Sequence, residues 1–207
     1  MKHSIILLFA LMAACSPSNN PFVEVEPTTT DPVIRARELN DSAIDLFTKN
    51  QKLNGDAALL IFDDAMALDS TYDKPLINKI AVLMQLRRFD EATKVAEKLH
   101  KLRPVDAELT ALSGWLYRLQ SDTANAVVYF GEAIKQLENQ LVNLDANAPV
   151  YQMQANKLAL LYWAIGNKEK CEALAPGMTT EEMPTDEAIA AQFWLSIRPE
   201  STETVED

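Results

Sequence analysis

Basic charge, histidine and glycine are all scarce in this chain, and each scarcity excludes a class of function. The 207 residues hold 19 Lys and Arg against 30 Asp and Glu, which gives a net charge of −11. Sequence-independent nucleic-acid binding needs a basic surface, so we predict no nucleic-acid partner. The same deficit argues against electrostatic docking on anionic lipid. The five glycines form no phosphate-binding loop, so no nucleotide site of that kind is predicted.

Residues that carry catalysis or bind metals are equally few. The chain has two histidines, and only His100 lies beyond the extreme N-terminus. It stands among Lys98, Lys101 and Arg103 on an expected helix, where we predict a solvated histidine and not a catalytic base. No His and Cys residues have the spacing of a metal site. We therefore predict a protein that has no catalytic activity of its own and needs no metal or cofactor.

Long apolar runs are absent except for a short one at the N-terminus. Residues 5–12 are all apolar, and two alanines and Cys15 follow them. The run is too short to span a bilayer as a stable helix, but it fits the core of a secretory signal peptide. Residues 11–15 resemble the bacterial lipobox, with Met12 at the position where leucine is commonest. The alternative is an ordinary signal peptide that happens to end in cysteine.

The lipobox resemblance implies that residues 1–14 are a lipoprotein signal peptide and that Cys15 is lipidated. Stable anchoring takes two acyl chains or more, since each buried methylene contributes about 0.8 kcal/mol. Ser16 stands where an aspartate would retain a lipoprotein in the inner membrane, which implies the outer membrane, facing the periplasm. Residues 15–31 are rich in proline and threonine, and we predict a flexible tether. Cys171, the other cysteine, is predicted to be a small packed thiol.

The rest of the chain shows a repeat. Apolar residues make up 48% of the sequence, enough for a sizeable core, and many recur at helical spacing. Three series repeat every 34 residues: Ala58, Ala92 and Ala126; Phe62, Ala96 and Phe130; and Ala65, Leu99 and Ala133. A fixed period of this length indicates stacked helical hairpins.

The apolar stripes and turn residues place the individual helices. Stripes are expected within 32–50, 58–68, 76–86, 92–102, 106–119 and 124–141, with turns at 54–56, 87–90 and 121–122. The spacer 139–149 displaces a fourth hairpin from the frame, and Pro176-Gly177 cuts its second helix short. Beyond Thr185, a final helix carries Ile189, Phe193, Trp194 and Ile197. We expect that helix to cover the exposed face of the last hairpin.

The repeated hairpins resemble the tetratricopeptide repeat (TPR). The matching residues are Gly114, Tyr117, Ala126, Phe130, Ala133 and Pro104. In such hairpins small residues sit where the two helices cross, and aromatic residues fill the space to the next hairpin. The resemblance implies an all-α, right-handed superhelix of about four TPR-type helical hairpins over 32–177. A capping-helix region over 178–198 and an acidic disordered tail over 199–207 complete the expected organisation.

The TPR resemblance also implies a concave groove, lined by the first helix of each hairpin. By register, the residues predicted to contact a partner are Ile77, Ala81, Met84, Trp115, Arg118, Met153, Asn156 and Trp163. Tryptophan and arginine are enriched among binding hot spots, and methionine suits adaptable contacts. For the two tryptophans, a place in the core of a tight superhelix is the alternative.

The resemblance to small TPR lipoproteins implies a lipid-anchored, non-catalytic scaffold that binds an envelope protein or peptide segment. A second hypothesis is a solute- or glycan-binding lipoprotein, accessory to an outer-membrane transporter. The chain lacks the extra loops that would build a closed pocket for such a ligand. An enzyme is the third hypothesis, for which the sequence offers no catalytic constellation.

Overall fold

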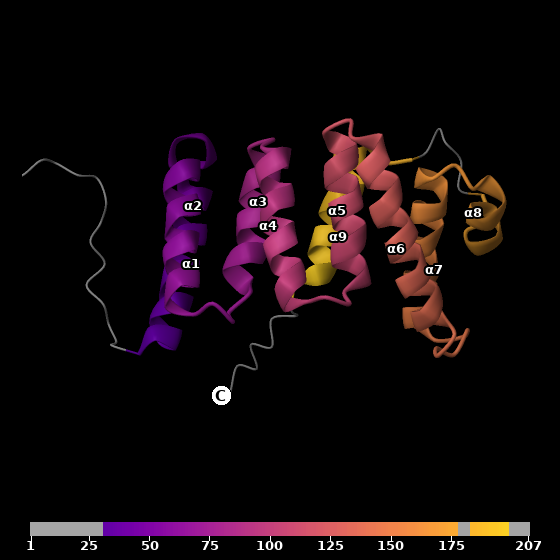
Figure 1. Ribbon diagram of the computed structural model, residues 1–207, viewed down its shortest axis with the longest axis horizontal. Coiled ribbons are helices and arrows are strands. Elements are labelled where there is room, and N and C mark those ends of the chain that lie inside the picture. Colours follow the sequence, from indigo (N-terminus) through magenta and orange to yellow (C-terminus); the bar gives the residue numbers. More distant parts are fainter. Residues whose placement is uncertain (1–30, 178–182, 199–207) are drawn as a thin grey trace, which may run out of the picture.

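The computed structural model describes residues 31–177 and 183–198, and most of these residues are helical. The helices are α1 (Pro32–Lys49), α2 (Gln51–Leu68), α3 (Lys74–Gln85), α4 (Phe89–Leu102), α5 (Ala107–Leu119), α6 (Thr123–Leu141), α7 (Pro149–Ala164), α8 (Lys168–Leu174) and α9 (Asp186–Ile197). Helices α1 to α8 pack as four hairpins that stand side by side in chain order (Figure 1). The predicted all-α, TPR-type solenoid is confirmed. The predicted signal peptide, Cys15 and the acidic tail lie outside the described residues.

Side-chain caps explain where several helices begin. An Asp, Asn or Thr oxygen accepts a hydrogen bond from a backbone N–H in the first turn, which otherwise has no partner within the helix. The caps are Asp31 for α1, Asn50 for α2, Asp106 for α5, Asp122 for α6, Asn167 for α8 and Thr185 for α9. Such caps involve neighbouring residues only, which is why the sequence locates the starts of α5, α6 and α9, although it missed that of α2.

Three hairpin turns share one backbone motif. Arg87, Ser121 and Gly166 each have positive φ, at 57°, 61° and 78°, and each stands two residues before the next helix. The following N–H groups bond back across the helix end: that of Arg88 reaches the Leu83 carbonyl at 2.8 Å, and equivalent bonds close the other two turns. This is the Schellman arrangement. Glycine adopts it without the cost that the first two residues incur.

The first hairpin differs from its prediction. We expected a turn at 54–56, but these residues lie inside α2, and Asn50 alone separates α2 from α1. Asn54 lies within α2, and its side-chain amide donates a 2.8 Å hydrogen bond to the Leu46 carbonyl in the last turn of α1. Asn54 therefore stabilises the end of α1 and does not form a turn. Gly55 is buried where α2 meets Leu86: an added Cβ would lie 2.8 Å from Leu86 Cδ1. The glycine therefore serves close packing.

The fourth hairpin agrees with its prediction. Helix α6 runs to Leu141, residues 142–148 form the loop, and α8 has only seven residues before Pro176. Cys171 is buried on this short helix, and burial raises the pKa of its thiol. The predicted packed thiol is thus confirmed.

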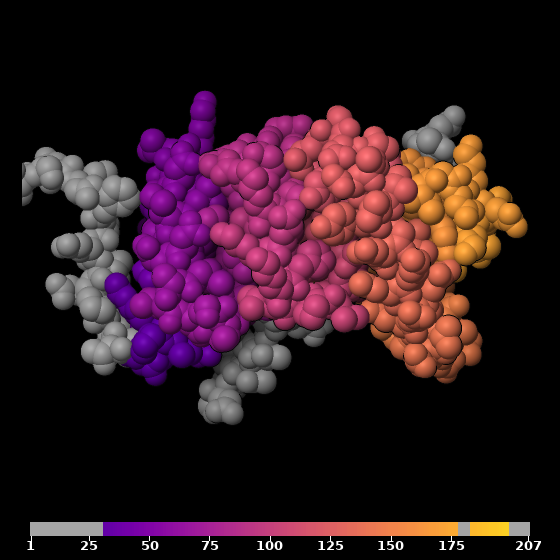
Figure 2. All heavy atoms as spheres, viewed as in Figure 1, coloured from indigo at the N-terminus to yellow at the C-terminus, as the bar shows by residue number. Residues whose placement is uncertain are grey.

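The final helix forms where predicted, but it packs elsewhere. Helix α9 was expected on the last hairpin; instead it lies mainly against α5, with a smaller contact to α3. Figure 1 shows it behind α5, and on the face seen in Figure 2 the hairpins hide it. Both α5 and α3 are first helices of their hairpins. Helix α9 therefore lies along the groove that the TPR resemblance implied.

Candidate partner-binding groove

The groove residues predicted from the sequence fall into two groups in the structure. Those on α3 and α5 are wholly or partly covered: Ile77 and Trp115 are 1% and 0% exposed, and Ala81, Met84 and Arg118 are half-buried. On α7, Met153 is 51% exposed and Asn156 is also exposed, whereas Trp163 is half-buried. Their predicted role in partner binding stays a prediction. The structure shows that α9 packs on α3 and α5, the helices that carry the covered residues.

Three of the predicted residues form one cluster. The rings of Trp115 and Trp163 stack with centroids 6.4 Å apart and planes 20° from parallel. The Arg118 guanidinium carbon lies 5.3 Å from the Trp115 ring centroid and 5.1 Å from that of Trp163. Both distances suit a cation–π contact. The cluster joins α5 to α7 across the groove.

Arg118 also ties this cluster to α9. Its Nε donates a 2.9 Å hydrogen bond to Asp186 Oδ2, and its guanidinium donates a 3.2 Å bond to the Ala164 carbonyl at the end of α7. Asp186 opens α9, where a carboxylate is also favoured by the helix dipole. One arginine therefore contacts three elements that are far apart in the sequence.

Further polar contacts hold α9 along its length. The Trp194 indole N–H donates a 2.8 Å bond to the Ile77 carbonyl of α3. Arg103 donates a 2.7 Å bond to the carbonyl of Ile197, the last residue of α9. At the other end Arg87 pairs with Glu187 at 3.0 Å. A hydrogen bond from its own backbone N–H, together with Arg87, lowers the pKa of Glu187.

A second polar group braces α5 against α7. Lys157 Nζ lies 3.0 Å from Glu108 Oε1, and Gln154 donates a 3.1 Å bond to the same oxygen. Burial by itself would raise the pKa of Glu108, but the hydrogen bond and charge of Lys157 outweigh it, so that pKa is lowered. The pair is 7% and 15% exposed at its side chains. It fixes the separation of two groove helices.

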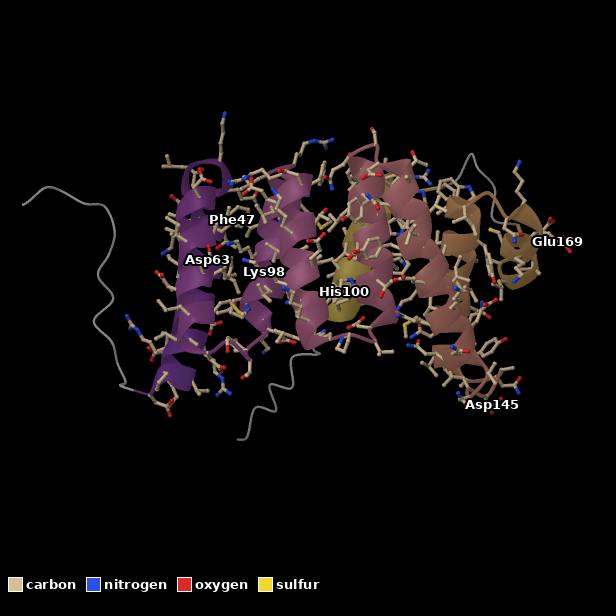
Figure 3. The ribbon with its side chains drawn as sticks, in the orientation of Figure 1. Phe47, Asp63, Lys98, His100, Asp145 and Glu169 are labelled. Atoms are coloured by element: carbon tan, nitrogen blue, oxygen red, sulfur yellow. The ribbon has the colours of Figure 1, made fainter. Side chains whose placement is uncertain are left out.

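His100 is not the solvated residue that the sequence predicted. It lies on α4 (labelled in Figure 3), half-buried, with Nε2 3.1 Å from Ser113 Oγ on α5. Its ring centroid is 6.1 Å from that of Tyr129. Burial lowers the pKa of His100 despite the opposing charges of Asp106, Glu132 and Glu97. The lysines around it in the sequence gave the wrong indication, because its own side chain points to the neighbouring hairpin.

We expect His100 to make folding pH-dependent. With its pKa lowered in the folded state, the unfolded chain binds more protons as the pH falls below about 6.5, so stability falls with pH in that range. One such proton contributes at most about 1.4 kcal/mol per pH unit. Urea unfolding of the wild type and His100→Gln between pH 7.5 and 5.5 measures the effect. The variant should lose less stability over this interval; equal slopes would contradict the expectation.

Helix α9 was predicted from the sequence, but its location was not. Its apolar residues were assigned to the last hairpin, although α8 is seven residues long and, apart from Cys171 and Leu174, consists of exposed residues. Such a short helix has little apolar surface to cover. The stretch 175–185 between α8 and α9 is long enough to carry the chain back to α5. The short α8 therefore argued against the predicted location of α9 on the last hairpin.

The described residues contain neither a candidate metal cluster nor a membrane-spanning helix. Within residues 31–177 and 183–198, no group of three His, Cys, Asp or Glu could hold a metal ion. Over the same residues, no helix is both long enough and apolar enough to cross a bilayer.

Two cavities adjoin the C-terminal end of α9. The larger, of about 470 Å³, is lined by Arg103, Val105, Asp106, Glu108, Gln140, Ser196, Ile197 and Arg198. The smaller, of about 170 Å³, lies between α1 and α3 and is also lined by Arg198. Ion pairs with Asp73 and Asp106 already occupy Arg103, so the larger cavity presents no uncompensated charge from that residue.

Comparison with known proteins yields structural neighbours only. No protein-family model matches the chain, and no curated protein matches it. Among solved structures, a crystal structure of MamA protein is 19% identical, covering 76% of this chain and 83% of that one, with a TM-score of 0.49. MamA residues 41 to the end from Desulfovibrio magneticus RS-1 is 16% identical, covering 79% and 78%, with a TM-score of 0.45. The TPR-type fold of this chain accordingly rests on its own repeated hairpins.

Proposed function

We propose that this protein is a lipid-anchored, non-catalytic adaptor of the cell envelope whose concave groove binds a helix of a partner protein. A single observation carries the binding mode: α9 already lies on α5 and α3. The groove therefore has the shape, apolar surface and polar contacts that a helix requires. Laying an amphipathic helix into an apolar groove is a recurring mode of recognition.

The part of the predicted groove on α7 is not covered by α9, and a partner can make its first contacts there. Met153 and Asn156 are exposed on α7, the helix whose C-terminal end carries Trp163 of the cluster. Val150, on the first turn of α7, is also exposed. This surface combines adaptable apolar contacts with an amide that can hydrogen-bond.

The membrane anchor of the proposal comes from the sequence. The apolar run ending at Cys15 supports lipidation, and the pattern after it supports the outer membrane, facing the periplasm. A Cys15→Ser variant is the direct check, since it should move the protein from the membrane fraction to the soluble fraction. An unchanged membrane fraction would contradict the anchor while leaving the groove untouched.

The alternative of a glycan- or solute-binding lipoprotein has less support. Small-molecule sites are concave and lined mainly by apolar and aromatic side chains. The larger described cavity is lined mostly by polar and charged residues and contains no aromatic ring. Thermal stabilisation across a panel of glycans would favour this alternative.

The adaptor proposal is tested by crosslinking and affinity purification of the full chain from native envelopes. We expect Met153→Asp to reduce recovery of a specific partner by about tenfold, the equivalent of 1.4 kcal/mol. Val128→Asp is the matched control, because Val128 is exposed to a similar extent but lies on α6. The proposal fails if both variants recover the same proteins as the wild type.

A further inference from the structure

Helix α9 lies in the groove without being packed on the hairpin that precedes it in the sequence. In a solenoid each repeat packs on the repeats next to it in the sequence. The four hairpins of α1 to α8 follow this rule, whereas α9, which follows α8 in the chain, packs mainly on α5 and to a smaller extent on α3. Helix α9 therefore packs on α5 and α3 as a separate helical ligand would, although it belongs to the same chain.

The apolar anchors of α9 have the spacing of a groove-binding helix. Ile189, Phe193 and Ile197 follow one another at four-residue intervals and are 0%, 0% and 3% exposed. Leu195, on the opposite face of α9, is 57% exposed. One stripe of α9 therefore meets the groove, as in helix-in-groove recognition.

The polar contacts set the direction of the bound helix. Acidic residues in its first turn meet Arg118 and Arg87, and its last carbonyl meets Arg103. A helix laid in the opposite direction would lose the carboxylate contacts with Arg118 and Arg87, and its acidic turn would meet Arg103, which already pairs with Asp73 and Asp106. The groove thus favours one orientation and an acidic N-terminal turn.

Several features keep α9 displaceable. A helix of 12 residues is marginal in water, so α9 depends on the groove for its helical structure. Arg87 and Glu187 are 69% and 42% exposed at their side chains, and exposed ion pairs contribute little. Covalent tethering, which raises the effective concentration of α9 at the groove, then accounts for part of its occupancy.

We infer that α9 is an internal competitor for the partner site. The partner is a protein carrying an amphipathic helix with an acidic first turn, followed by large apolar residues three, seven and eleven positions after the acid. These are the spacings from Asp186 to Ile189, Phe193 and Ile197. Helix α9 covers the α3 and α5 part of the groove until a competing helix binds there and releases it. This inference rests on the proposed adaptor function and adds the partner's chemistry and its regulation.

The test uses the intact full chain and an isotopically labelled synthetic peptide of residues 183–198. Amide hydrogen exchange is followed by mass spectrometry with and without excess peptide. We expect the peptide to speed exchange in α9 by about tenfold or more and to leave exchange in α5 unchanged, since local opening is independent of global unfolding. The matched control is the same peptide with Phe193→Asp, which should have no effect.

Three outcomes would overturn the inference. Helix α9 amides could stay as protected as those of α5 at all peptide concentrations. Exchange could rise in every helix together, which would make α9 an inseparable part of the fold. The chain could also form a dimer in which α9 is exchanged between copies, as light scattering would show. None of these depends on the envelope capture with Met153→Asp, so failure of the adaptor proposal and failure of this inference are distinguishable.

Discussion

Replacing Trp115 by alanine should lower the free energy of unfolding by about 3–5 kcal/mol, a typical loss for a large aromatic residue in a core. The side chain is fully buried, and its ring packs edge-on against Phe130 at a centroid distance of 4.9 Å. Alanine would also remove the stack with Trp163 and one cation–π contact of Arg118. Urea denaturation followed by circular dichroism measures the loss.

Trp163→Ala is the matched control for this prediction. Trp163 belongs to the same cluster but is half-buried, so its removal leaves a smaller cavity and should cost less. Equal losses for the two variants, or a loss below about 1 kcal/mol for Trp115→Ala, would contradict the structure. The result also bears on binding studies: lost partner binding in Trp115→Ala would follow from unfolding. Met153→Asp avoids this ambiguity.

Gly114→Ala should destabilise the protein even though alanine is the better helix former. An added Cβ would lie 2.5 Å from Phe130 Cδ1 and 2.6 Å from its Cε1. Phe130 is buried against Trp115, so its ring has little room to move. Overpacking of this kind costs about 1–3 kcal/mol, which exceeds or offsets the gain in helix propensity of about 1 kcal/mol.

The chain offers an opposite case in Gly131→Ala. Gly131 lies inside α6, and a Cβ added there would meet no heavy atom within 4 Å. The helix-propensity gain is then unopposed, and stability should rise by about 0.5–1 kcal/mol. Thermal and urea unfolding of both variants should give changes of opposite sign. Stabilisation by Gly114→Ala would show that the crossing of α5 and α6 is looser than described.

The hairpins could be predicted because their contacts are local and repeated. Residues such as Ala92 and Ala126 recur 34 positions apart because each hairpin packs on the next in the same way. Caps such as Asp106 and Asp122 bond within three residues, so helix starts were visible in the chain. The Gly114 packing position could likewise be recognised, since only glycine permits so close an approach.

Two errors arose where a local signal had more than one physical reading. Asn54 and Gly55 are typical turn residues, yet Gly55 is needed inside α2 for its approach to Leu86. His100 stands among basic residues, yet its own position on α4 directs it to Ser113 on the next hairpin. Turn propensity and neighbouring charge describe a residue's surroundings along the chain. Packing depends on its surroundings in space.

The sequence by itself determined that the chain folds into paired helices, and it predicted which residues would line the groove. Tertiary structure alone decided where α9 lies, and with it which of those residues are covered. The physical reason is the separation along the chain: the contacts of Trp194 with Ile77 and of Asp186 with Arg118 join residues 117 and 68 positions apart. An amphipathic stripe specifies that a helix needs an apolar partner. Among several apolar surfaces, only the folded arrangement selects the one it covers.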